Sequence, residues 1–167
     1  DHIVSVTDFD RCEHLGYFFI MEYIDGVTLS SILKREPQPM SPERAIRLIY
    51  QACDALAAMH DVGVVHRDLK PGNVMVCEHH GEDFIKLLDF GIASNVFEVS
   101  DSKKLYGTPA YMAPEQTRTM NVDGRADQFS LCTILYQLLA GQRPWNIKRW
   151  SDASMVARVS QPLRPVS

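Results

Sequence analysis

The stretch HRDLKPGN, residues 66–73, gathers a carboxylate, a cation and an amide in one short segment. Asp68 could accept a proton, Lys70 could offset negative charge, and Asn73 could offer an oxygen to a cation such as Mg²⁺. A second carboxylate, Asp89, follows in LLDFGIA. Each residue taken singly is more common as a turn former, a helix cap or a solvated charge. The chemistry therefore depends on whether the fold brings these side chains together.

Two β-branched runs could do this. VMV at 74–76 and FIKLLDF at 84–90 are predicted to be strands, separated by the polar turn CEHHGED. A hairpin of this kind would carry Asn73 and Asp89 to the same end. The Cys and His residues of the turn could suggest a metal site, but their spacing matches no zinc pattern, and a hairpin turn is the favoured interpretation.

The rest of the chain alternates between segments with the residue pattern of a strand and segments with the residue pattern of a helix. Strands are also predicted at 2–9 and 17–23, joined by a polar turn, and at Val64–Val65. Helices are predicted at 28–36, at 127–141, at 151–160, and between a Ser41 cap and Gly63. The last of these carries an apolar stripe of Ile49, Ala52, Cys53, Leu56 and Met59. The helix at 127–141 is apolar nearly all round, which predicts a buried position.

Composition excludes several classes of protein. With 46% hydrophobic and 23% charged residues, the 167-residue chain can form one packed domain or one lobe of a larger domain. A net charge of −4 argues against a nucleic-acid partner. Four widely spaced cysteines favour a reducing compartment over a disulfide framework. The acidic start is unlike a signal peptide, and the apolar run at 129–141 is too short to span a bilayer.

A third motif, GTPAYMAPE at 107–115, follows the first two. In this order and spacing the three motifs resemble those of the protein kinases, and LKPGN with GTPAYMAPE resembles the Ser/Thr branch. YMAPEQ and GRADQFSLC are most similar to bacterial kinases of the eukaryotic type. The resemblance covers nearly the whole chain. It implies an α+β, protein-kinase-like fold, with the end of the N-lobe at 1–23, a hinge at 24–28 and a truncated, mostly helical C-lobe at 29–167.

The resemblance implies ATP-dependent phosphoryl transfer to Ser or Thr of protein substrates. This reaction needs positioning and charge neutralisation more than covalent chemistry. Asp68 would accept the proton of the substrate hydroxyl, and Lys70 would offset charge near the γ-phosphate. Asn73 and Asp89 would hold Mg²⁺ through oxygen atoms. Thr108 would hydrogen-bond Asp68 and Lys70 and help to hold the substrate-docking loop.

The segment FIMEYIDG resembles the strand and hinge that hold adenine. Met21 would be the gatekeeper residue. The backbone carbonyl of Glu22 and the backbone amide and carbonyl of Ile24 would face the adenine edge. Thr28 could reach the ribose, and Met75 would lie under the adenine ring.

Other matches imply structural roles. Asp127 resembles a buried carboxylate that holds the backbone amides of the catalytic loop. His66 and Phe90 resemble two members of a hydrophobic column between the lobes. Glu115 resembles an acid that pairs with an Arg further along the family's chain. Cys132 departs from the glycine that is common at its position.

The family's Gly-rich loop, its phosphate-binding strand Lys and its helix Glu do not occur in these residues. We therefore expect an excerpt of a longer protein, inactive by itself, whose kinase domain is cytoplasmic and meets a membrane only through segments outside this chain. Two alternatives stay open. One is a catalytically dead kinase-like scaffold, although Asp68, Asn73 and Asp89 are intact. The other is a small-molecule phosphotransferase of the same superfamily, which would lack GTPAYMAPE.

Arg67 before Asp68 marks kinases whose activation loop is ordered by phosphorylation, since a phosphate can pair with the guanidinium. Ser94, Ser100 and Ser102 are candidate acceptors, and the polar context EVSDSKK favours the last two. Replacing both favoured serines by alanine is expected to lower the activity of an autophosphorylated sample. Unchanged phosphate incorporation into substrate would contradict this hypothesis.

Overall fold

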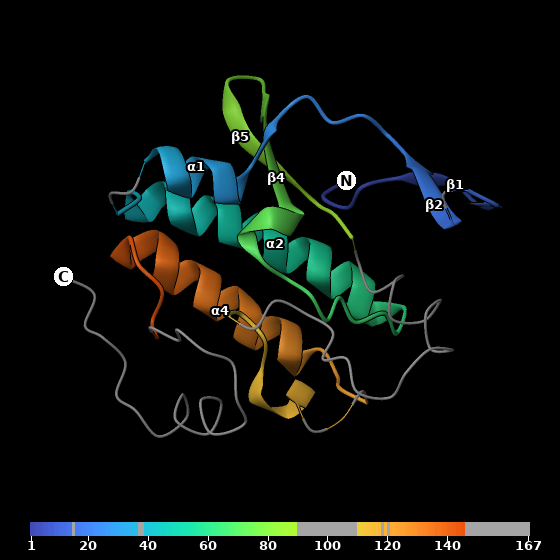
Figure 1. Cartoon of the computed structure of the whole chain (residues 1–167). Helices are drawn as coiled ribbons and strands as arrows, with labels where there is room; N and C mark the ends of the chain where they lie inside the picture. Colours follow the sequence, from blue (N-terminus) through green and yellow to red (C-terminus); the bar gives the residue numbers. More distant parts are fainter. Residues whose placement is uncertain (15, 37–38, 90–109, 118, 120, 146–167) are drawn as a thin grey trace.

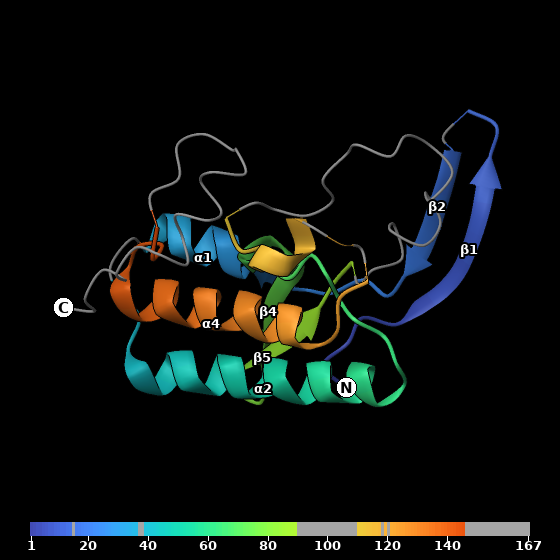
Figure 2. The ribbon, with the colours of Figure 1, turned by 90° about the horizontal axis from the view of Figure 1, so that it is seen from below.

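The computed structural model describes residues 1–14, 16–36, 39–89, 110–117, 119 and 121–145. These residues form a helical body, from which a two-stranded sheet projects to one side (Figures 1 and 2). The predicted helix at 151–160 lies outside the described residues. In the part of the chain that is described, no helix is both long and apolar enough to cross a membrane.

The helical body contains α1 (Leu29–Arg35), α2 (Pro42–Asp61) and α4 (Arg125–Ala140). Helices α2 and α4 lie side by side and antiparallel in both views (Figures 1 and 2). Their facing surfaces share one apolar core with α1 and the strands above them. Fully buried members of this core include Leu29, Leu48, Ile85, Leu87, Ile134 and Leu138. Burial of these side chains is the main source of stability for the body.

The ends of α2 follow from its sequence. Ser41 has a non-helical backbone, and its Oγ accepts a hydrogen bond from the backbone N–H of Arg44 at 3.3 Å. Pro42 occupies the first turn, where its missing N–H costs nothing. Gly63, just beyond the helix, adopts a φ of +77°. The predicted cap and stop signals are confirmed.

The predicted helix faces need two corrections. Cys53 is exposed, because the buried face of α2 is formed by Ala45, Leu48, Ala52, Ala55, Leu56 and Met59. Helix α4 is buried on one side rather than all round, and both Gln128 and Cys132 are exposed. A helix that packs mainly against one neighbour needs only one apolar face, so apolar composition overestimated its burial.

Five strands form two separate sheets in the described part of the chain. β1 (Val6–Cys12) pairs antiparallel with β2 (Gly16–Met21), and β3 (Val27–Thr28), β4 (Val74–His79) and β5 (Glu82–Leu87) form the second sheet. The first predicted strand was placed too early. Ile3 forms an isolated parallel bridge with Leu87, so the residues before β1 add to the second sheet instead.

Two further strand predictions differ from the structure. Val64–Val65 is not a strand, because the backbone N–H of Val64 bonds back to the carbonyl of Met59 at the end of α2. β5 begins at Glu82 and ends at Leu87 rather than spanning 84–90. The predicted hairpin turn before it is confirmed: His80 and Gly81 both have positive φ, as a two-residue hairpin turn requires.

Gly26 lets the chain approach β4 closely as it enters β3. A Cβ at this position would lie 2.6 Å from the backbone oxygen of Val76 and 3.1 Å from Cβ of Cys77. The obstacle is mainly backbone of a paired strand, which cannot move without disturbing the sheet.

We expect Gly26→Ala to lower the free energy of unfolding by about 1–3 kcal/mol, the usual cost of overpacking. Gly72→Ala is the matched control, because its Cβ would meet only Lys70 side-chain atoms at 3.9 Å or more. Denaturant unfolding of both variants measures the difference. Equal stabilities would show that β3 does not need this close approach.

Candidate active site

The loop between α2 and β4 carries the predicted catalytic residues. It has no regular structure from Val64 to Lys70 and then forms the 3-10 turn η1 (Pro71–Asn73). His66 and Leu69 are almost completely buried, while Asp68 and Lys70 are half-buried. Arg67 has a φ of +66°, in the left-handed region that is unusual for a non-glycine residue. A strained residue next to the buried His66 indicates that tertiary contacts hold this loop in place.

Asp127, in the first turn of α4, supplies those contacts. Its Oδ2 accepts a hydrogen bond from the backbone N–H of His66, and its Oδ1 accepts one from the N–H of Arg67, both at 2.8 Å. Nε2 of His60 lies 2.8 Å from the same Oδ2 and donates to it. The carboxylate is fully buried, so these bonds replace the water that it has lost. The role that the resemblance implied for Asp127 is confirmed.

Asp68, Lys70 and Asn73 converge within the loop. Nζ of Lys70 lies 2.6 Å from Oδ2 of Asp68. Nδ2 of Asn73 donates to the backbone oxygen of Asp68 at 3.0 Å and approaches its Oδ2 at 3.4 Å. Asn73 uses its amide nitrogen in both contacts, so neither consumes the amide oxygen. The loop thus presents a carboxylate, a cation and an amide oxygen together.

The β4–β5 hairpin brings Asn73 and Asp89 to one end, as predicted. Val74 pairs with Leu87, and the N–H of Leu88 donates to the backbone oxygen of Asn73 at 2.9 Å. Asp89 follows immediately, exposed and with a φ of +54°. An amide oxygen and a carboxylate at one end of a hairpin are a donor set that fits Mg²⁺.

His66 ties this hairpin end to the loop. Its Nε2 donates to the backbone oxygen of Leu88 at 3.0 Å, while its Nδ1 faces the N–H of Asp68 at 3.4 Å. The neutral ring with the proton on Nε2 satisfies both contacts. Burial lowers the pKa of His66 below its usual value, which favours this neutral form.

The predicted adenine segment begins at the end of β2. Met21 is the last residue of that strand and is 41% exposed. The carboxylate of Glu22 accepts a bond from the N–H of Ser5 and pairs with Lys86. Ile24 is half-buried.

Thr28 and Met75 lie opposite each other in the β3–β4 pairing. The hydroxyl of Thr28 caps α1: it accepts the N–H of Ser31 at 3.2 Å and bonds its Oγ at 2.9 Å. The sequence prediction did not include this capping role. Thr108, Phe90 and the candidate phosphorylation sites lie outside the described residues.

Sequence reasoning missed Gln116 as a link between motifs. Its Nε2 donates to the backbone oxygen of Arg67 at 2.7 Å, and its Oε1 accepts the N–H of Ala113 at 2.9 Å. Ser130 Oγ of α4 donates to the backbone oxygen of Tyr111 at 2.9 Å. The described end of GTPAYMAPE is therefore fixed both to the loop and to α4. The only signal in the sequence was the position of Gln116 directly after this motif.

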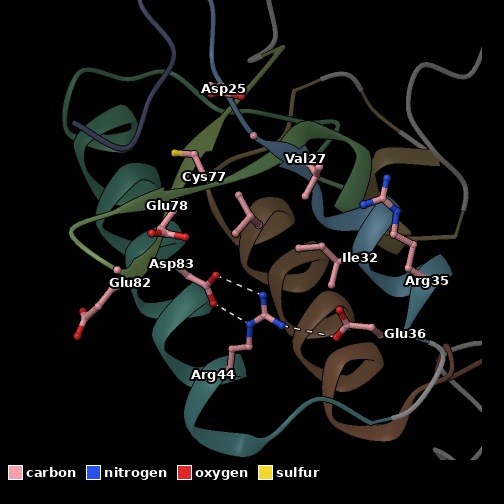
Figure 3. Close-up of a pocket in the computed structure, with 13 residues that line it drawn as sticks. Asp25, Val27, Ile32, Arg35, Glu36, Arg44, Cys77, Glu78, Glu82 and Asp83 are labelled. Carbon is pink, nitrogen blue, oxygen red and sulfur yellow. Dashed lines mark hydrogen bonds and ion pairs between the residues drawn. The ribbon is translucent and has the colours of Figure 1, made fainter.

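A cavity of about 330 Å³ lies between α1, α2 and the outer half of the β4–β5 hairpin (Figure 3). Arg44 crosses it, with Nε 2.7 Å and Nη2 3.2 Å from the two carboxylate oxygens of Asp83. Nη1 of Arg44 also lies 3.7 Å from Glu36. None of the predicted site residues lines this cavity, so we assign these ion pairs a structural role: they join the hairpin to α2.

Comparison with known proteins identifies the class. The protein kinase domain family matches residues 1–163, and the chain belongs to this family. It is 43% identical over 149 residues to the serine/threonine-protein kinase pkn3 of Myxococcus xanthus, covering 85% of this chain and 27% of that protein. It is 42% identical over 132 residues to PknB of Mycobacterium tuberculosis, covering 77% of this chain and 20% of that protein. The predicted similarity to bacterial Ser/Thr kinases is confirmed.

A solved bacterial kinase domain has a similar fold. The crystal structure of the Mycobacterium tuberculosis PknI kinase domain matches with a TM-score of 0.69 and 28% identity. The match covers 99% of this chain and 55% of that one. The predicted protein-kinase-like fold is confirmed. The chain spans about a quarter of the length of the pkn3 relative and about half of this solved domain.

Asp127→Asn tests the anchor of the loop. An amide has one acceptor oxygen, so at least one buried N–H would lose its partner, and we expect a loss of about 3 kcal/mol in the free energy of unfolding. Asp123→Asn is the control: the Asp123–Arg125 pair is exposed, so its loss should leave the free energy of unfolding nearly unchanged. Denaturant unfolding compares the two variants. Equal losses would remove Asp127 from its anchoring role.

Proposed function

We propose that the protein containing this chain transfers the γ-phosphoryl group of ATP to Ser or Thr hydroxyls of protein substrates, with Mg²⁺. The observation that carries this proposal is the convergence of Asp68, Lys70 and Asn73 in one loop, next to the hairpin end that presents Asp89. Family membership supports the same reaction. The chain covers only part of its relatives, so the proposal concerns the whole protein.

Each residue has a role that its surroundings support. Asp68 accepts the proton of the substrate hydroxyl, and its position is fixed because the preceding backbone is bonded to Asp127. Lys70, paired with Asp68 at 2.6 Å, is a cation that can turn to the transferred phosphoryl group. Asn73 and Asp89 hold Mg²⁺, which neutralises phosphate charge when bound. The family resemblance assigns Thr108, which lies outside the described residues, as a further partner for Asp68 and Lys70.

The nucleotide lies between the two sheets under this proposal. Residues 1–23 are the end of the N-lobe, 24–28 the hinge and 29–167 the C-lobe. The separation of the β1–β2 sheet from the β3–β4–β5 sheet supports this division. Met21 borders the adenine, the backbones of Glu22 and Ile24 bind its edge, and Met75 packs beneath it. The hydroxyl of Thr28 contacts the ribose as well as accepting the Ser31 N–H at the start of α1.

Arg67 supports regulation by phosphorylation. Its Nε is buried and has no hydrogen-bond partner among the described residues, although its backbone is held on both sides. A phosphate on Ser100 or Ser102 would offer charge-assisted hydrogen bonds to this guanidinium.

Because ATP is the proposed donor, the proposed reaction takes place in the cytoplasm.

The GTPAYMAPE segment favours protein substrates over small molecules, since its described end is fixed to the catalytic loop. A kinase-dead scaffold would not need the Asp68–Lys70–Asn73 cluster. Phosphate transfer to a generic basic protein, compared with transfer to a sugar or an aminoglycoside, tests the small-molecule alternative. Absence of any transfer by the full-length protein would favour the scaffold.

Asp68→Asn and Asp89→Asn separate the proposed roles in the full-length protein. Asp68→Asn should lower transfer by at least about 10²-fold, the lower range for a lost general base, without weakening ATP binding. Asp89→Asn should weaken Mg²⁺-dependent ATP binding itself, because it removes a metal-binding charge. Radiolabel transfer and nucleotide titration measure the two effects.

Asp54→Asn, at an exposed position on α2, is the control for both variants and should change neither quantity. Near-normal turnover of Asp68→Asn would show that another group accepts the proton.

A further inference from the structure

The segment between β2 and β3 is fixed at its two ends. At one end, Gly26 lies against the backbone of Val76, too close to admit a side chain. At the other end, Glu22 is bonded twice to Ser5: its N–H donates to the Ser5 oxygen at 3.0 Å, and its Oε1 accepts the Ser5 N–H at 2.8 Å. Tyr23, between these ends, is 90% exposed. The segment is therefore held at both of its ends.

Lys86 of β5 completes the contact at Glu22. Its ammonium group donates to the same Oε1 that accepts the Ser5 N–H. The Lys86 side chain is 19% exposed and that of Glu22 is 32% exposed, so water only partly screens the pair. The hydrogen bond from Lys86 is the main cause that lowers the pKa of Glu22, which keeps the carboxylate charged.

This ion pair adds a side-chain link to the backbone hydrogen bonds that residues 2–4 already make with β5. Among the described residues it is the only ion pair that links the end of the β1–β2 sheet to the β3–β4–β5 sheet. The β1–β2 sheet projects away from the helical body (Figures 1 and 2). On β5, Lys86 lies opposite Met75, and Met75 lies opposite Thr28. The pair thus ties the 22–26 segment to the strands that carry two proposed nucleotide contacts.

We propose that Glu22 and Lys86 are positioning residues for the nucleotide: their ion pair fixes the 22–26 backbone at the distance from β4 and β5 that adenine requires. This inference rests on the proposed function, in which the backbones of Glu22 and Ile24 bind the adenine edge. It adds roles for the two side chains. The pair acts on nucleotide affinity and not on the phosphoryl-transfer step, because Asp68 is held separately: the N–H of Arg67 before it bonds to Asp127, and Asn73 bonds to its backbone oxygen.

Lys86→Met in the full-length protein tests the inference, since methionine keeps most of the apolar stem and removes the charge. We expect the dissociation constant of Mg²⁺–ATP to rise about fivefold. This corresponds to the loss of an ion pair whose contribution lies near the upper end of those measured for exposed pairs. The rate at saturating ATP should change less than about twofold, because an interaction that holds substrate and transition state equally affects binding and not turnover. Lys86→Arg, which can still donate to Glu22, should restore the affinity.

Lys34→Met is the matched control, because it removes the same charge from an exposed position on α1 and should leave nucleotide affinity unchanged. Hydrogen exchange at the Ser5 amide gives a readout that does not need nucleotide, and it should become faster in Lys86→Met. Glu22→Gln is the second variant if Lys86→Met does not fold, because the amide oxygen can still accept the Ser5 N–H.

Unchanged affinity in Lys86→Met, or a lower rate at saturating ATP with unchanged affinity, would overturn the inference and leave the proposed function intact. A wild-type full-length protein that binds no ATP would overturn both.

Discussion

The buried carboxylate of Asp127 fixes the geometry of the loop between α2 and β4. Burying a charge is costly unless polar groups replace its water, and here the N–H groups of His66 and Arg67 and the ring of His60 do so. These bonds join α4 to a loop that lies some sixty residues earlier in the chain. The left-handed backbone of Arg67 is tolerated because its neighbours are bonded in this way. The side chain of Asp68 therefore extends from a backbone position that these bonds fix.

A second set of contacts builds outward from this anchor. His66 bonds to Leu88 at the end of β5, and Leu88 bonds to Asn73 before β4, so the loop and the hairpin share one end. Gln116 attaches the 110–117 segment by bonding to the backbone oxygen of Arg67. Elements far apart in sequence thus meet around one short stretch of backbone. This arrangement gives the site its rigidity, which a reaction that depends on positioning requires.

Many features of the fold and of the site could be predicted from the sequence where they depend on patterns of neighbouring residues. The Ser41 cap, the stop after α2, the β4–β5 hairpin and the joint position of Asn73 and Asp89 follow from short-range patterns and are confirmed. The errors occurred where partners are distant. Val64–Val65 has the composition of a strand, but its backbone bonds to the end of α2. Residues 2–4 were predicted to belong to the first strand, yet they pair with β5. Their own sequence does not indicate which distant strand they pair with.

The sequence alone specifies the residue types of the site: HRDLKPGN, LLDFGIA and the hairpin between them supply a carboxylate, a cation and the oxygen atoms of the proposed Mg²⁺ site. The family could also be identified from the sequence, because several motifs in a fixed order are specific to one family. The groups that hold these residues in place could be identified from the three-dimensional structure alone. The bonds from His60 to Asp127, from Gln116 to Arg67 and from Lys86 to Glu22 join side chains whose partners are set by packing across elements, and no local periodicity encodes such pairings.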